Sequence, residues 1–214
     1  VYKLNTDKQT ISVIPPSPDQ NSAYNTHQTV TLKLNPASGK TISEAWYKVT
    51  STATEAAYNN TDLTWRDFIS ISDYNAATSS ASLTISTEGK SYIHWYIKDS
   101  ANIENQDKTG YFEIDTIAPV IGTPTATAQS SSAISLNITP ASTDSGSGIS
   151  AKKWQYKTSP SGTFTDITGV TTESYTHSGL VSGTIYYYKF VTTDFAGNKT
   201  ESPVVSATTN SEGG

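Results

Sequence analysis

Short stretches in which apolar and polar residues alternate recur along the chain, and turn-forming residues separate them. Alternation with a period of two places successive side chains on opposite faces and is typical of half-buried β-strands. In the first half it predicts strands at residues 10–14, 29–34, 44–50, 82–86, 91–98 and 109–114. In the second half it predicts strands at residues 132–138, 152–158, 174–177, 185–193 and 204–208. Residues 62–74 depart from this pattern and are expected to form a short helical turn or an irregular loop.

The length of the chain and a proline-bearing segment divide it into two domains. The chain has 214 residues, and a sandwich of the immunoglobulin type takes roughly 100. Pro119 cannot donate a ladder hydrogen bond, and it favours extended backbone at the residue before it. We therefore expect an all-β chain with one β-sandwich at residues 1–117 and a second at residues 118–214, which ends in a short polar tail.

Both halves show the same order of features. Trp46 lies on the strand predicted at residues 44–50 and Trp154 on that at residues 152–158, and in each half a later aromatic strand runs into Asp99 or Asp194. This shared order indicates two copies of one topology.

Residues 180–188 resemble the turn into strand F of fibronectin type III domains. In that family a leucine packs under the turn and a Gly-Thr pair precedes the tyrosine of the tyrosine corner. The resemblance therefore assigns structural roles to Leu180, Gly183 and Tyr186. The family usually has a tryptophan on strand B, whereas Trp154 of this chain lies on strand C and is more immunoglobulin-like.

The first half resembles bacterial Ig-like repeats through residues 88–94, residues 98–102 and the junction at residues 114–119. Residues 194–198 are similar to a hairpin that is common in bacterial repeats of both kinds. Together these resemblances imply two tandem immunoglobulin-like and fibronectin type III-like β-sandwiches. They also imply an extracellular location in a secreted or surface-attached bacterial protein.

Composition excludes several classes of partner. The net charge is −5 and the lysines are scattered, so nucleic acid is not expected as a partner. The chain has no cysteine, which excludes disulfides and thiolate metal sites. No apolar run approaches the roughly 20 residues that a membrane span needs. Because methionine is absent as well, we expect a piece of a longer protein.

No catalytic constellation is found, and we do not expect an enzyme. The three histidines His27, His94 and His177 are far apart and lack metal-ligand spacing. Residues 39–41 match only the end of a phosphate-binding loop.

Aromatic residues of the irregular stretch are the candidate ligand-binding residues. Trp65 is the leading one, with Tyr58 and Tyr74 nearby, because loops often carry binding residues. The alternative, which we favour, is that Trp65 plugs the end of the sandwich. On residues 92–98 both strand faces are bulky, so one aromatic set is expected to meet solvent or the neighbouring domain.

Acidic loops raise a second binding hypothesis. Asp144 falls in the B–C loop of the second domain, Asp194 and Asn198 fall in its F–G loop, and Asp115 lies in the linker. Oxygen ligands at that end predict a Ca²⁺ site at the interdomain junction. The alternative is stronger: Asp and Asn in such loops form turns by bonding their own backbone. No other cofactor is expected.

These features favour a non-catalytic extracellular module pair of a larger bacterial surface or secreted protein. Its role would be that of a spacer or of an adhesion and protein-interaction element. Its partner would be a protein or a glycan at the cell surface. The alternative is a carbohydrate-binding accessory module of a secreted polysaccharide-degrading enzyme, which requires exposed aromatic residues on one face.

Overall fold

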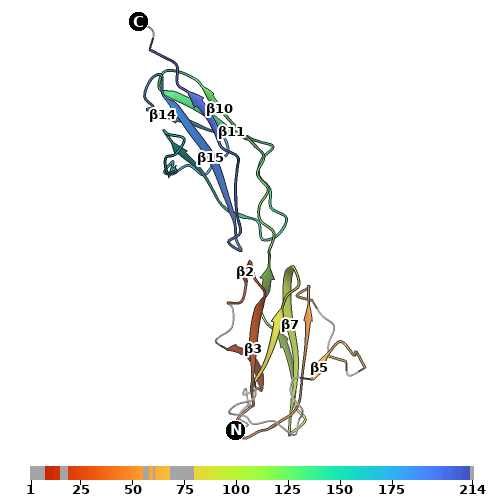
Figure 1. The fold of residues 1–214 in the computed structure, drawn as a ribbon. Helices are drawn as coiled ribbons and strands as arrows, with labels where there is room; N and C mark the ends of the chain where they lie inside the picture. Colours follow the sequence, from red (N-terminus) through yellow and green to blue (C-terminus); the bar gives the residue numbers. More distant parts are fainter. Residues whose placement is uncertain (1–7, 15–18, 55–57, 60, 68–79, 213–214) are drawn as a thin grey trace, which may run out of the picture. The chain divides into compact units, whose positions relative to one another are not determined.

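The chain forms two compact units, Val1–Asp115 and Thr116–Gly214. The computed structural model describes residues 8–14, 19–54, 58–59, 61–67 and 80–212. Within these residues all regular structure is β-strand, which confirms the all-β fold of two tandem sandwiches (Figure 1). The division falls two residues before the boundary expected from the sequence. Among the described residues no helix is long and apolar enough to span a membrane.

Unit 1 contains two sheets. The first has the order β1 (Thr10–Ile14), β3 (Gln28–Asn35), β6 (Ser80–Ile85). The second has the order β2 (Ser22–Tyr24), β9 (Phe112–Ile114), β7 (Gly89–Asp99), β4 (Ile42–Thr50), β5 (Arg66–Asp67), and β8 (Glu104–Lys108) also pairs with β7. All of these pairs are antiparallel except β2 with β9, which is parallel.

The core of unit 1 lies between these two sheets. Alternate residues of β3 and β7 point inward, so Leu32 and Leu34 meet Ile93, Trp95 and Ile97. All five are buried, and burial of such side chains supplies most of the favourable free energy of folding. The strands therefore expose their polar residues on the outer faces.

Unit 2 also contains two sheets. The first has the order β10 (Thr123–Ala128), β11 (Ala133–Thr139), β14 (Tyr175–Ser178). The second has the order β13 (Thr165–Asp166), β12 (Ile149–Lys157), β15 (Ile185–Asp194), β16 (Lys199–Glu201), and β17 (Val205–Thr208) also pairs with β15. Trp154 on β12 is fully buried and its ring centroid lies 5.0 Å from that of Phe190, its partner on β15.

The turn before β15 is held by a buried tyrosine. The hydroxyl of Tyr186 accepts a hydrogen bond of 2.9 Å from the backbone N–H of Val181. Leu180 packs against the core of unit 2. Gly183 has a φ of 62°, in the left-handed region that favours glycine. Thr209 is buried and its hydroxyl donates to the Val181 carbonyl at 2.7 Å, which ties the turn to the end of the chain.

Alternation does not predict every strand. It misses the strands β2, β5, β8, β10, β13 and β16, each of which pairs with a single neighbour. An edge strand is held by backbone hydrogen bonds on one side and needs few apolar side chains. Of the 62–74 stretch, residues 62–67 form a turn and β5 rather than a helix, and the rest lies outside the described residues.

Replacement of Tyr186 by phenylalanine tests the hydrogen bond to Val181. The ring is 4 % exposed, so the backbone N–H loses its acceptor in a place that water reaches poorly. We expect Tyr186→Phe to lower the free energy of unfolding by about 1 to 2 kcal/mol in urea titration. Tyr187→Phe, on the opposite face of β15, is the matched control and is expected to change little. Equal effects of both substitutions would contradict the assigned role.

The surroundings of His177 predict that unit 2 loses stability in mild acid. Its Nδ1 lies 3.1 Å from the Tyr188 hydroxyl, and the rings of Tyr156 and Tyr186 surround it. Burial lowers the pKa of His177, so the unfolded chain binds the proton more readily than the folded one. Stability is therefore complete above the unfolded pKa of about 6.5 and falls as pH drops below it.

We expect the urea midpoint of residues 116–212 to fall between pH 7.5 and pH 5. His177 is the only histidine of this fragment, and its carboxylates titrate near pH 4 or below when unfolded. His177→Gln is expected to abolish the drop. A drop of equal size in that variant would assign the acid sensitivity to other groups.

Candidate functional site

The outer face of the large sheet of unit 1 presents ordered rows of side chains. The register of β4, β7 and β8 places Glu44, Lys98 and Glu104 side by side in one row. The next row consists of Trp46, Tyr96 and Gln106. Because the intervening residues of β7 point into the core, these rows face away from it.

Part of the chain covers the aromatic row. The ring of Tyr58 is stacked on Tyr96 at 4.1 Å between centroids and 15°, and on Trp46 at 5.9 Å and 28°. Trp65 meets Tyr58 edge-on at 5.2 Å. The backbone N–H of Tyr58 donates to Gln106 Oε1 at 3.2 Å. These contacts fix Tyr58 above the sheet, so only 6 % of Tyr96 is exposed.

Asp62 anchors the 58–65 loop, of which the structure describes every residue except 60. The Oδ1 of Asp62 accepts from the backbone N–H of Thr64 at 3.0 Å and from its hydroxyl at 2.6 Å. The Oδ2 accepts from Lys48 Nζ at 3.1 Å. The Thr64 hydroxyl, its N–H and Lys48 lower the pKa of Asp62 to about 2. The anchor is therefore charged throughout the physiological pH range.

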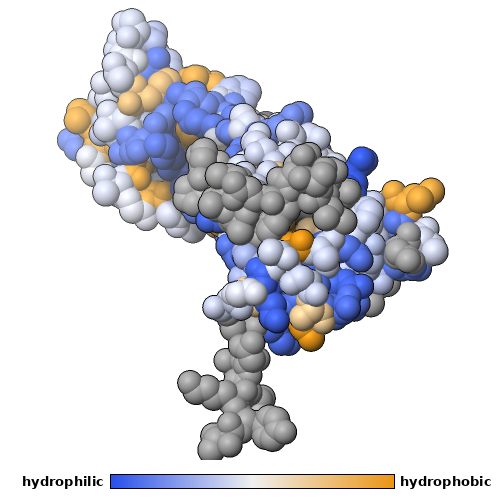
Figure 2. Space-filling model, turned by 90° about the horizontal axis from the view of Figure 1, so that it is seen from below, coloured by the Kyte–Doolittle hydropathy of each residue, from blue (hydrophilic) through white to orange (hydrophobic). Residues whose placement is uncertain are grey.

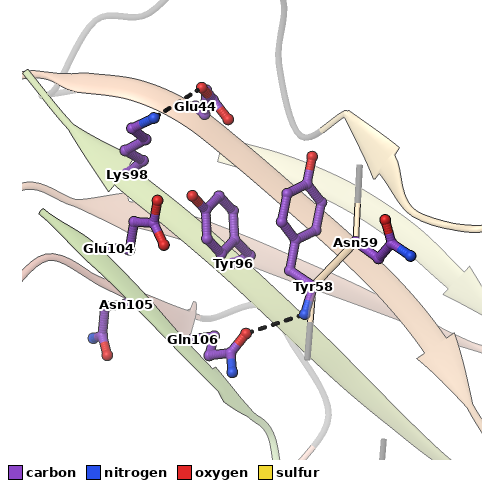
Figure 3. A pocket seen from close by; sticks show the side chains of 8 residues that line it. All are labelled: Glu44, Tyr58, Asn59, Tyr96, Lys98, Glu104, Asn105 and Gln106. Atoms are coloured by element: carbon purple, nitrogen blue, oxygen red, sulfur yellow. Dashed lines mark hydrogen bonds and ion pairs between the residues drawn. The ribbon is translucent and has the colours of Figure 1, made fainter. Parts of the chain in front are cut away.

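A cavity of about 670 Å³ opens beside Tyr58 on this face. Its lining comes from β4, β7, β8 and the 58–65 loop and consists of Glu44, Tyr58, Asn59, Tyr96, Lys98, Glu104, Asn105 and Gln106 (Figure 3). In the close view the two tyrosine rings lie side by side, Glu104 and Gln106 lie on the same side of β8 as these rings, and Asn105 lies on the other side of the strand (Figure 3). The volume falls within the range of roughly 300 to 1,000 Å³ that small-molecule sites span.

The charges of the cavity come from two carboxylates and one ammonium group. Lys98 Nζ lies 3.6 Å from Glu44 Oε1. Burial, followed by a hydrogen bond to the Glu104 side chain and by the charges of Glu104 and Glu44, raises the pKa of Tyr96. The phenol is therefore protonated at neutral pH and donates to the Glu104 carboxylate.

Of the three binding residues expected from the sequence, the structure places one in the lining of the cavity. Tyr58 lines the cavity. Trp65 is 8 % exposed and supports Tyr58 from the side, outside the lining. Tyr74 lies outside the described residues. The face of β7 that carries the even-numbered aromatic residues was expected to meet solvent or the other domain. Its residue Tyr96 is instead covered by Tyr58 of the same unit.

Sequence reasoning missed most of the cavity. Tyr96 was noted only as part of a bulky face, and β8 with Glu104, Asn105 and Gln106 was not expected as a strand. The sequence does show that both faces of residues 92–98 carry bulky side chains, so that another part of the chain must cover the outer one. It does not show that β8 pairs beside this face, because β8 is polar at every position.

His94 has a structural environment. It is 7 % exposed, and its Nε2 lies 2.9 Å from the Thr50 hydroxyl and 3.1 Å from the Thr52 carbonyl. The Thr50 hydroxyl donates to the same carbonyl at 2.8 Å. Nε2 therefore carries the proton and donates, so His94 cannot act as a base toward Thr50 in this arrangement.

The residues predicted to bind calcium make turns in their own units. In unit 2, Asp144 Oδ2 accepts from the N–H groups of Gly146 and Gly148, at 3.1 and 2.7 Å. Asp194 accepts from the N–H and the side-chain amide of Asn198, both at 2.8 Å. Asp115, which ends unit 1, donates its N–H to the Tyr24 carbonyl.

Asp144 and Asp194 nevertheless each place a carboxylate oxygen within 4.8 Å of the other. Asp144 Oδ1 is buried and has no hydrogen-bond partner among the described residues. A cation bound there would give this oxygen a partner, and calcium at these residues stays a prediction.

Comparison with known proteins identifies the fold and no family. No protein-family model matches the chain, and no curated protein matches it. A crystal structure of three consecutive domains from titin is 13% identical, covers 94% of this chain and has a TM-score of 0.61. The chain covers 66% of that structure, about two thirds of its length.

Two further structures are less similar. The FN1-FN3 domains of chicken CNTN1 are 13% identical, with 91% of this chain and 67% of that one covered and a TM-score of 0.43. The fibronectin type-III domain of human fibronectin type III domain containing protein 3 is 23% identical, with 44% and 86% covered and a TM-score of 0.36. The fold class is that of tandem immunoglobulin-like and fibronectin type III-like sandwiches, and no catalytic family is indicated.

Replacement of Asp62 by asparagine tests the loop anchor. The amide has the same size but lacks the charge that holds Lys48 and the second acceptor oxygen. We expect Asp62→Asn to loosen the loop at pH 7 and to increase acrylamide quenching of tryptophan fluorescence, because Trp65 and Trp46 lose their cover. Asp19→Asn, an exposed position elsewhere in unit 1, is the control. Unchanged quenching in Asp62→Asn would mean that ring stacking alone holds the loop.

Proposed function

We propose that the chain is a non-catalytic extracellular module pair of a larger bacterial surface or secreted protein. In this proposal unit 1 binds a partner at the cell surface and unit 2 acts as a spacer. The cavity on the outer face of β4, β7 and β8 is the observation that carries the proposal. Its walls are mostly framework strands, and a site on rigid elements keeps its geometry without a partner.

The corresponding face of unit 2 supports the division of roles. There, Lys153 pairs with Asp166 at 2.9 Å, and Lys189 and Lys199 pair with Glu201 at 2.5 and 2.6 Å. The two lysines lower the pKa of Glu201 to about 2. The charged groups of this face therefore satisfy one another, which favours a solvated surface over a binding site.

One face of the molecule is mostly hydrophilic. On the face shown in Figure 2 the described residues are mostly hydrophilic, and the hydrophobic ones form small, separate groups. Single exposed apolar residues are normal on soluble domains and do not make an interface. The absence of cysteine and the low charged fraction of 15% suit the bacterial extracellular context that the sequence resemblances imply.

The binding role is tested on an array that carries purified extracellular proteins together with glycans. We expect the 214-residue chain to bind at least one of them and Glu104→Arg to lose that binding, because a cation replaces a carboxylate in the cavity. Asp166→Ala, on the corresponding face of unit 2, is the control and should bind as the parent does. Parallel assays with calcium and with chelator test the predicted metal site.

Two results would contradict the proposal. Turnover of any bound molecule would contradict the non-catalytic role. Binding lost in Asp166→Ala and retained in Glu104→Arg would place the site on unit 2.

A further inference from the structure

The cavity of unit 1 contains carboxamides with hydrogen-bonding capacity to spare. Gln106 uses Oε1 to hold Tyr58, and its Nε2 has no partner among the described residues. Asn105 pairs with the core residue Ile97, so it lies on the opposite face of β8, where it donates its Nδ2 to the Gln9 carbonyl at 2.8 Å. The Oδ1 of Asn59 accepts bonds within its own turn, and its Nδ2 remains a donor. The amide donors of Gln106 and Asn59 thus lie around one space with the carboxylate acceptors of Glu44 and Glu104.

The charges of the cavity select against anions. The lining contains two carboxylates, Glu44 and Glu104, and one ammonium group, Lys98, so its net charge is negative. An anionic ligand would meet a net negative wall and lose affinity through repulsion. A small cation would use the carboxylates but none of the three donors that Lys98, Asn59 and Gln106 provide. A neutral ligand that both donates and accepts would use the whole set.

The aromatic part of the cavity gives the ligand a flat apolar wall. Tyr58 is half-buried, and its contacts with Tyr96, Trp46 and Trp65 fix the plane of its ring. A fixed aromatic plane loses little conformational entropy when a ligand packs against it. The C–H faces of sugar rings are flat and apolar, while their hydroxyl groups each donate and accept.

We infer that this cavity binds a neutral oligosaccharide, with one sugar ring against Tyr58 and its hydroxyl groups on Glu104 and Gln106. The inference rests on the proposed function of unit 1 and names the ligand class of the same site. The volume of about 670 Å³ suits a short segment of a glycan and is too small for the surface of a folded protein. The site differs from the one expected around Trp65, which here holds Tyr58 in place.

The test uses the whole chain on an array of neutral, sialylated and sulfated oligosaccharides, together with arginine- and lysine-rich peptides. Titration calorimetry then measures affinity for the strongest neutral oligosaccharide. We expect neutral glycans to bind and their sialylated or sulfated forms to bind more weakly. Glu104→Ala should weaken binding by about tenfold or more, because a charge-assisted hydrogen bond is lost. Tyr58→Ala should reduce binding at least as much.

Asp107→Ala is the matched control, since Asp107 lies next along β8 and outside the cavity lining. It should leave the affinity and the melting temperature unchanged. Tyr58→Ala could disturb the loop. If its melting temperature falls, the test is decided by the result for Glu104→Ala alone.

Three results would overturn the inference. Glycan binding that survives Glu104→Ala with unchanged affinity would place the glycan elsewhere. Binding to basic peptides or to proteins with no glycan bound would leave the proposed function standing with a different ligand. Absence of binding to every glycan, peptide and protein would remove the inference and the binding role of unit 1 together.

Discussion

The structure of unit 1 depends on the pairing of one long strand, β7. It pairs with β4 along almost its whole length and with β8 and β9 at different parts of its other edge. Its odd-numbered residues Ile93, Trp95 and Ile97 fill the core. The strand must therefore present His94, Tyr96 and Lys98 on the outside, because a shift by one residue would exchange the two faces.

This constraint leaves the bulky row of Trp46, Tyr96 and Gln106 on the outer face, where the 58–65 loop of the same unit covers it. Tyr58 stacks on Tyr96, while segments around Thr50 and Thr52 hold His94. The cover is polar at its anchor, where Asp62 binds Lys48, and aromatic where it meets the sheet. The cavity lies beside Tyr58, and Glu44, Lys98 and Glu104 are part of its lining.

Unit 2 meets the same constraint with a different surface. Its long strand β15 buries Tyr186, Tyr188 and Phe190, and its outer face carries Lys189 and Tyr187. Short ion pairs to Glu201 and a cation–π contact of Lys189 with Phe164 at 4.7 Å fill that face. Apart from β2, which has no counterpart in unit 2, the two units share an order of strands. The side chains on the outer face decide which unit can hold a ligand.

The sequence by itself determined the fold class, the two-domain organisation and the long central strands. Their signal is local, because a half-buried strand must alternate apolar and polar residues wherever it pairs. The turn around Tyr186 could likewise be located, since its glycine and tyrosine act over a few residues. Strands such as β8, which is polar throughout, and β10, with Pro124 at an edge, carry no such signal because backbone bonds to one neighbour hold them. Only the tertiary structure decided that Glu104 and Gln106 lie beside Tyr96, and that Tyr58 rather than Trp65 lines the cavity. The physical reason is that cross-strand register and loop packing join residues up to about sixty positions apart, and no local pattern encodes that distance.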